Sequence, residues 1–284
     1  MRRTLLLLSV LAATTCTNRV TTADREIAPA ATFAAPPGLA AAQRASQDAR
    51  ADPALIGDLV ASNHILGEHG IFDGFGHVSV RHGRNPNRYL LSRSLAPELV
   101  TVDDIVELDL ESKALNAGAR ALYLERFIHG AIYKARPDVN AIVHSHSPEL
   151  IPFSVSSVPL RPVSHTAGFI TDGVPVFDIR KASGITDMLV SDADRAARLA
   201  ATLGTHPAVL MRGHGVVVVG ASLPIAVGRS IYLELNAKLQ TQAIALGGTL
   251  TYLDPQEARR VMAAGENGGY QRAWDLWKRK AGGK

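Results

Sequence analysis

The chain has 284 residues, a formal net charge of +4 and a single cysteine, Cys16. Such a small net charge argues against a nucleic-acid-binding role. One cysteine excludes an intrachain disulfide and a zinc site built from several thiolates. Imidazole and carboxylate groups must therefore carry any metal or acid/base chemistry.

The N-terminus has the pattern of an export signal. Arg2 and Arg3 precede the apolar run LLLLSVLAA, and no run in the sequence reaches the roughly twenty apolar residues that a membrane-spanning helix needs. We therefore expect a signal peptide over residues 1–26 and an exported, periplasmic protein without a transmembrane segment. Cys16 suggests a lipid attachment site at the outer face, although Thr15 stands where such sites want a smaller residue, and the arginine pair is compatible with export of a folded, metal-loaded protein. A cytoplasmic protein with a misassigned start is the alternative.

The next stretch lacks the periodicity of a folded segment. Ala, Thr and Pro dominate from Thr17 to Pro37, which predicts a flexible linker over residues 27–42 once the signal is removed. The remaining residues, 43–284, fit one domain.

Strand-like and helix-like segments alternate through this domain. Helices between strands predict a central sheet covered on both faces. The glycines of GEHGIFDGFGH lack the strand-then-helix setting of a phosphate-binding loop, so dinucleotide binding is not expected. The expected strands are 77–82, 89–92, 105–110, 140–146, a segment near Val163, 174–179 and 208–212. The expected helices are 53–68, 122–134, 191–203, 223–246 and one carrying Trp274 and Trp277 before a solvated basic tail.

The stretch LYLERFIHGAIYKARPDVNAIVHSHS, residues 122–147, brings one carboxylate and two imidazoles within reach of a single ion. Glu125 lies on a helical turn, and the strand that follows has a period of two, which sends His144 and His146 to the same face. Neutral imidazoles held in this way suit zinc and similar divalent ions.

A third ligand is best sought at His214, between two glycines that would let the backbone approach a buried site closely. Any one of these histidines alone is more often a hydrogen-bonded core or surface residue. The set of three with a preceding glutamate is specific for a metal. Three protein ligands with an open position indicate a catalytic rather than a structural site.

The sequence resembles the class II aldolase/adducin family from about residue 53 to residue 252. The resemblance rests on GHVSVR, on the Glu125 segment, on HSHS and on RGHG. It implies an α/β fold, a three-layer α/β/α single domain with a mixed sheet, and a homotetramer with the active site near a subunit boundary. It also implies that His144, His146 and His214 bind one divalent ion per subunit, zinc first, with manganese, iron or cobalt as alternatives. Glu125 would then act as acid/base.

The chain departs from the sugar-phosphate aldolases of this family where they hold phosphate. An asparagine, a Thr-Gly pair and a Ser-Ser pair are replaced in this chain by His77, by Ser94 with Leu95, and by Tyr123 with Leu124. A phosphate would lack small donors and close backbone approach, so the substrate is expected to carry no phosphate.

Two arginines could hold a carboxylate instead. Arg93 and Arg212 each offer paired N–H donors, and with Ser94 they are the candidate substrate-binding residues. The alternative role of both arginines is packing or a salt bridge between subunits.

The combination of FGHVSVR, LLSRSLAPELVT, HSHSPELIPFSV and LMRGHG is similar to the branch that includes 3,4-dihydroxyphthalate decarboxylase. It implies a metal-dependent carbon–carbon lyase that decarboxylates a small hydroxy-aromatic or hydroxy acid, with the ion stabilising the developing anion and Glu125 moving the proton. His165, in RPVSHTAGF, is a second candidate proton donor, or else a surface histidine. The alternatives are an aldolase or epimerase for an unphosphorylated hydroxy-carbonyl compound, and a non-enzymatic adducin-like module.

Overall fold

The computed structural model describes residues 51–265 and 269–282. The predicted signal peptide, residues 1–26, and the predicted linker, residues 27–42, lie outside the described residues. Among the described helices, none is long and apolar enough to cross a membrane.

A seven-stranded mixed sheet forms the middle layer. Its order is β3-β2-β1-β4-β7-β6-β5, and every neighbouring pair is antiparallel except β5 and β6. β1 and β4 are distant in the sequence but adjacent in the sheet. The strands are β1 (His77–Arg81), β2 (Arg88–Ser92), β3 (Ile105–Asp109), β4 (Ala141–Ser145), β5 (Val176–Phe177), β6 (Ala208–Met211) and β7 (Gly215–Gly220).

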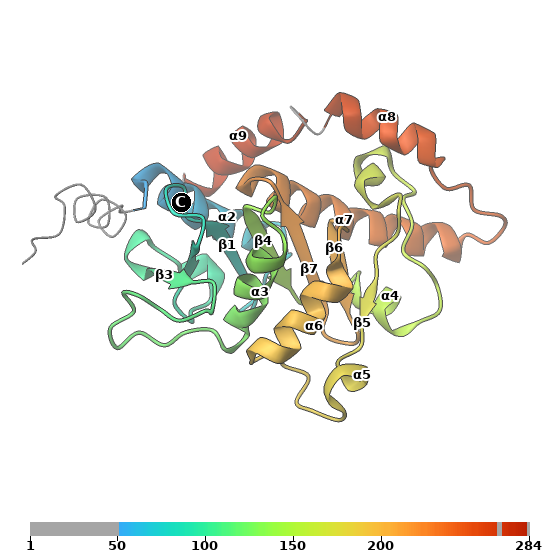
Figure 1. Ribbon diagram of the computed structural model, residues 1–284. Helices are drawn as coiled ribbons and strands as arrows, with labels where there is room; N and C mark the ends of the chain where they lie inside the picture. Colours follow the sequence, from blue (N-terminus) through green and yellow to red (C-terminus); the bar gives the residue numbers. More distant parts are fainter. Residues whose placement is uncertain (1–50, 266–268, 283–284) are drawn as a thin grey trace, which may run out of the picture. The chain divides into compact units, whose positions relative to one another are not determined.

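Helices cover both faces of the sheet (Figure 1). Side chains that alternate along β4 point into two separate cores, one on each face of the sheet. Val143 packs into the core beneath α2, α7 and α9, whereas Ile142 packs into the core beneath α3 and α6. The three-layer α/β/α fold with a mixed sheet is thereby confirmed. These helices are α2 (Pro53–Glu68), α3 (Phe127–Ala135), α6 (Ala193–Leu203), α7 (Leu223–Ala245) and α9 (Gly269–Ala281).

Shorter helices connect the main elements. α2 has the predicted bounds because the Asp52 side chain caps it and Pro53 begins it. The connecting helices are η1 (Pro97–Leu99), η2 (Val102–Asp104), η3 (Leu124–Arg126), α4 (Ile151–Val155), η4 (His165–Ile170), α5 (Ile179–Ser183) and α8 (Pro255–Gly265). The predicted helix over residues 122–134 is thus a 3₁₀ turn, η3, followed by α3.

Several predicted elements were wrong in extent. The predicted strand near Val163 is absent, and the Val163 N–H donates instead to the Asn236 side chain of α7. The predicted strand 174–179 shrinks to β5 because the Asp178 side chain caps α5. The predicted basic tail is helical to the end of α9, where Lys278 pairs with Asp58 of α2.

The segment 208–220 forms two strands rather than one strand and a turn. β6 and β7 pair in an antiparallel hairpin, and β7 lies between β6 and β4 at the centre of the sheet. The turn of this hairpin carries His214 and so returns it beside the end of β4.

Candidate metal centre

Backbone geometry at the ends of β4 and β7 places three histidines together. His144 lies within β4, opposite Val217 of β7, and His146 follows one residue beyond the strand. In the hairpin turn, Gly213 has a φ of +63°, a conformation that glycine adopts without strain. Gly215 lies so close to β4 that a Cβ atom would overlap the Ser145 carbonyl oxygen. The two glycines therefore allow the close approach that the sequence predicted.

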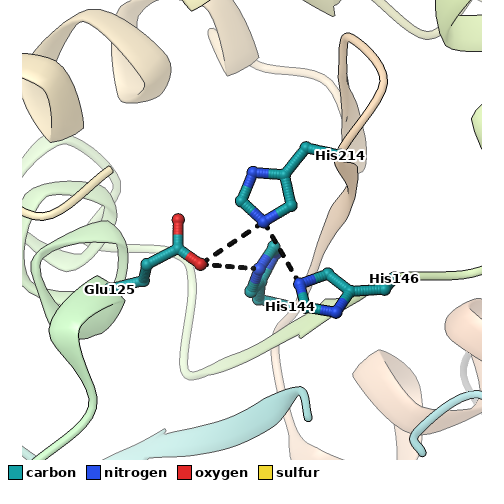
Figure 2. Close-up of side chains that lie close together, drawn as sticks. All are labelled: Glu125, His144, His146 and His214. Atoms are coloured by element: carbon teal, nitrogen blue, oxygen red, sulfur yellow. Dashed lines mark hydrogen bonds and ion pairs between the residues drawn. The ribbon is translucent and has the colours of Figure 1, made fainter. Parts of the chain in front are cut away.

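The structure brings Glu125 and the three histidines into one cluster, drawn in Figure 2. Each offers one ligand atom, and these atoms all lie within 4.8 Å of one another. Nε2 of His146 is 3.1 Å from Nε2 of His214, and Oε2 of Glu125 is 3.4 Å from Nε2 of both His144 and His214. Glu125 reaches the cluster from η3, at the start of α3.

The outer hydrogen bonds of the cluster fix which nitrogens are bare. Nδ1 of His144 is 3.1 Å from the Val216 carbonyl, and Nδ1 of His214 is 3.2 Å from the Met188 carbonyl. Since a carbonyl only accepts, we assign the ring hydrogens to Nδ1, which leaves both Nε2 lone pairs facing the cluster. His144 Nε2 is buried without a hydrogen-bond donor among the described residues.

This donor set fits a divalent cation. Bare imidazole nitrogens and a carboxylate are all acceptors, and only a proton or a metal ion between them turns their mutual approach into an attraction. Oε1 of Glu125 accepts a hydrogen bond of 2.8 Å from the Val190 N–H, which holds the carboxylate with its other oxygen toward the histidines. The groups that orient these side chains are thus backbone groups from the loop before α6 and from β7.

Electrostatics in the cluster favour an ionised Glu125 and a neutral His146. Burial acts to raise the pKa of Glu125, but the nearby imidazoles of His144 and His214 outweigh burial and hold that pKa far below its usual range. Burial lowers the pKa of His146 to about 4, with help from its two imidazole neighbours. For His214, burial is outweighed by Glu125, so its pKa is raised. A metal ion would take the place of the proton that His214 otherwise attracts.

A cavity of about 570 Å³ opens in front of the cluster. Glu125, His144 and His146 contribute to its wall, as does Ser94, one of the predicted substrate-binding residues. Of the described residues, no arginine or lysine lines it. The remaining lining residues are Gly74, Phe75, Gly76, His77, Leu95, Ala96, Leu122, Tyr123, Leu124 and Leu189.

The two predicted substrate-binding arginines have other partners within this chain. Arg93 pairs with Asp104 at 2.6 Å, and Arg212 pairs with Asp178 at 2.8 Å. Neither is among the residues that line the cavity. Both arginines thus pair within the chain, and carboxylate recognition by either of them stays a prediction. His165, at the exposed start of η4, is likewise outside the cavity wall, and its role as proton donor stays a prediction.

A buried hydrogen-bond chain behind the cavity was missed from the sequence. It runs from His77 through His129 and Ser79 to Tyr133. Burial, followed by the charge of neighbouring imidazoles, lowers the pKa of His77 well below its ordinary value and that of His129 to about 3, so both rings are neutral. A signal was present, because His-x-Ser in a strand and His-x-x-x-Tyr in a helix each put two polar residues on one face.

Comparison with known proteins agrees with this site. Residues 57–241 match the family described as Class II Aldolase and Adducin N-terminal domain, and the chain belongs to that family. The decarboxylase tropJ of Talaromyces stipitatus is 35% identical over 243 residues, which cover 78% of this chain and 91% of that protein. The 3,4-dihydroxyphthalate decarboxylase of Arthrobacter keyseri is 28% identical over 225 residues, covering 74% of this chain and 87% of that protein.

A solved structure shares the fold. The L-fuculose 1-phosphate aldolase from Glaciozyma antarctica superposes with a TM-score of 0.66 at 27% identity, over 80% of this chain and 88% of that chain. The predicted resemblance to the class II aldolase/adducin family, with decarboxylases among the relatives, is therefore confirmed. Named decarboxylases and aldolases among these relatives support a lyase-type enzyme.

Proposed function

We propose that the protein is a divalent-metal-dependent carbon–carbon lyase that decarboxylates a hydroxy-aromatic or hydroxy acid. The observation that carries the proposal is a cluster of three histidines and one glutamate, of which Glu125, His144 and His146 lie in the wall of a cavity with largely apolar lining. His144, His146 and His214 would hold the ion, zinc first. When bound, a divalent ion supplies Lewis-acid stabilisation for negative charge that develops on the substrate as the bond breaks.

The lining of the cavity supports a compact organic acid rather than a sugar phosphate. Phe75 and Leu124 on the wall are 68% and 61% exposed, and Leu95, Tyr123 and Leu189 complete an apolar surface. Apolar walls with few convergent polar groups are typical of sites for small aromatic or aliphatic ligands. Among the described residues the wall offers no guanidinium or ammonium group for a phosphate dianion.

Glu125 is the proposed acid/base group. At neutral pH a glutamate is ionised, so it meets the substrate as a carboxylate. In that form it accepts the proton of the substrate's hydroxyl group and returns it to the carbon that loses carbon dioxide. The Val190 N–H fixes Oε1, so Oε2 is the oxygen available to move the proton.

An activity screen tests the proposal. Full-length protein loaded in turn with zinc, manganese, iron and cobalt is incubated with hydroxy-aromatic acids, aliphatic hydroxy acids and unphosphorylated hydroxy-aldehydes, and carbon dioxide and aldehyde release are followed. Metal-dependent carbon dioxide release supports the decarboxylase. Aldehyde release without carbon dioxide supports the second candidate, an aldolase or epimerase for hydroxy-carbonyl compounds, which the shared fold with a sugar-phosphate aldolase favours. A protein that binds no metal is the outcome expected of an adducin-like module.

Location and assembly form a separate part of the proposal. The Arg2–Arg3 pair and the apolar run after it support export, with a cytoplasmic protein as the alternative. The family resemblance supports a homotetramer. Cell fractionation tests the first, and light scattering of the purified protein tests the second.

A further inference from the structure

The buried chain that ends at the cavity has a direction that can be worked out from its distances. Ser79 Oγ lies 2.8 Å from the Tyr133 hydroxyl and 2.6 Å from Nδ1 of His129, and Nε2 of His129 lies 2.6 Å from Nδ1 of His77. The other acceptor near the Tyr133 hydroxyl, the Asn140 carbonyl, is 3.5 Å away, too far for a good hydrogen bond. Tyr133 therefore donates to Ser79.

The direction of this first hydrogen bond fixes the direction of the others in the chain. With its oxygen accepting from Tyr133, Ser79 donates its own hydrogen to Nδ1 of His129, so the hydrogen of the neutral His129 ring lies on Nε2 and is donated to Nδ1 of His77. His77 then carries its hydrogen on Nε2. Within residues 51–265 and 269–282, this Nε2–H has no hydrogen-bond partner, and His77 lines the cavity.

The position of His77 puts this donor beside the cluster of Glu125 and the three histidines. His77 of β1 is directly opposite His144 of β4 in the sheet, and their ring centroids are 5.0 Å apart. Tyr123 also packs against the His77 ring, with centroids 4.7 Å apart. An oxygen that accepts from His77 would therefore lie next to whatever the cluster holds.

We propose that His77 is a specificity-determining hydrogen-bond donor. It selects substrates that carry a second oxygen next to the oxygen that faces the cluster of Glu125 and the three histidines. Ser79 and His129 are positioning residues, because they act only by orienting His77. The inference rests on the proposed function, since it names the substrate feature that the same cavity recognises. It explains why a buried polar chain, costly in a packed core unless its groups are paired, ends at the cavity wall.

Binding of two simple probes tests the proposal without any turnover. Catechol has two adjacent oxygens and phenol has one, and their affinities for the zinc-loaded full-length protein are measured by titration calorimetry. We expect His77→Phe, which keeps the ring shape without the donor, to bind catechol about three- to tenfold more weakly than wild type, with phenol unchanged. His77→Gln, which keeps an N–H donor, should stay within about twofold of wild type for catechol. Catechol binding by His77→Phe at wild-type affinity would overturn the proposal.

A second pair of variants and a spectroscopic readout test the orienting chain. Ser79→Ala removes the hydroxyl that fixes His129 and should weaken catechol binding while leaving phenol binding unchanged. Ser230→Ala is the matched control, since Ser230 is a buried serine whose hydroxyl donates to the Ala226 carbonyl of its own helix, and it should change neither affinity. In ¹⁵N-histidine-labelled wild type, ring-nitrogen shifts should show His77 protonated at Nε2. Protonation at Nδ1 instead would overturn the proposal even if a variant failed to fold or to retain zinc.

Failure of this inference and failure of the proposed function are distinguishable. A protein that separates catechol from phenol through His77 but decarboxylates no acid refutes the proposed function alone. If the protein is an active decarboxylase and its His77→Phe variant prefers catechol over phenol as strongly as wild type does, only the role of His77 is refuted.

Discussion

Replacing Glu125 with glutamine separates proton transfer from metal binding. Glutamine keeps the size of the side chain and a carbonyl oxygen that can accept the 2.8 Å hydrogen bond from the Val190 N–H. At the other end an amide group replaces Oε2, which lies 3.4 Å from Nε2 of both His144 and His214. The change therefore removes the base while the three imidazoles stay in place.

The expected effect is large on turnover and small on stability. Losing general acid/base help lowers the rate by about 10² to 10⁴, which corresponds to about 3 to 5 kcal/mol in activation free energy. A hydrogen bond to a neutral acceptor replaces one to a carboxylate at Val190, which costs about 1 kcal/mol of folding stability. For a domain of this size, that lowers Tm by about 2 to 4 °C.

The assay compares zinc content, Tm and turnover in four proteins. Wild type and Glu125→Gln are measured beside Glu111→Gln, an exposed carboxylate paired with Lys134, and His144→Ala, a ligand loss. Glu125→Gln should keep its zinc and lose turnover, Glu111→Gln should match wild type, and His144→Ala should lose zinc. Normal turnover in Glu125→Gln would move the acid/base role elsewhere, with His165 tested next. Zinc loss as complete as in His144→Ala would make Glu125 a fourth ligand.

Three further predictions follow from the same contacts. Removing the metal by dialysis against a chelator should leave the protein folded but lower its Tm by about 8 to 16 °C relative to protein at a thousandfold excess of zinc over Kd, measured by calorimetry. Gly215→Ala should cost about 1 to 3 kcal/mol and reduce zinc content, because its Cβ would overlap a carbonyl oxygen of β4, whereas Gly57→Ala in open space on α2 should be neutral or stabilising. The hydrogen bond from Thr101 and the pairing with Arg93 lower the pKa of Asp104 to about 2. The free energy of unfolding at pH 7 should therefore be higher for the wild type than for Asp104→Asn, by up to about 2 kcal/mol. Since a lowered carboxyl pKa stabilises the folded state above the ordinary value, denaturant unfolding should show this difference shrinking as pH falls from about 4 toward 2.

Local sequence rules predicted the parts of the fold whose causes lie within a few residues. The bounds of α2 follow from a capping aspartate, a proline at the first position and helical periodicity. His144 and His146 share a face because a strand repeats every two residues, and the structure brings them together with His214 through the hairpin of β6 and β7.

Contacts between distant segments could not be predicted in this way. Nothing near Arg212 in the sequence indicates that Asp178, at the cap of α5, accepts its hydrogen bond, and the pairing of Arg93 with Asp104 depends on the fold of η2. The Val190 N–H that holds Glu125 comes from a loop with no periodic pattern. The motifs therefore pointed to side chains that the structure clusters, whereas the partners of the two arginines come from tertiary contacts that no motif contains.

The buried chain shows a signal that periodicity does contain. Along β1, Val78 and Val80 face the core beneath α2, so the alternate positions His77 and Ser79 must face α3. α3 is a helix within a three-layer core, and His129 on it lies one turn before the tyrosine that completes the chain. Polar groups at such positions are tolerated only when paired, because an unpaired buried donor costs about 1 to 3 kcal/mol. When a strand and a helix both present polar side chains to the same interior layer, these side chains must therefore hydrogen-bond to one another. His77, at the end of the buried chain and in the cavity wall, then marks the place where we propose that a ligand accepts the remaining hydrogen bond.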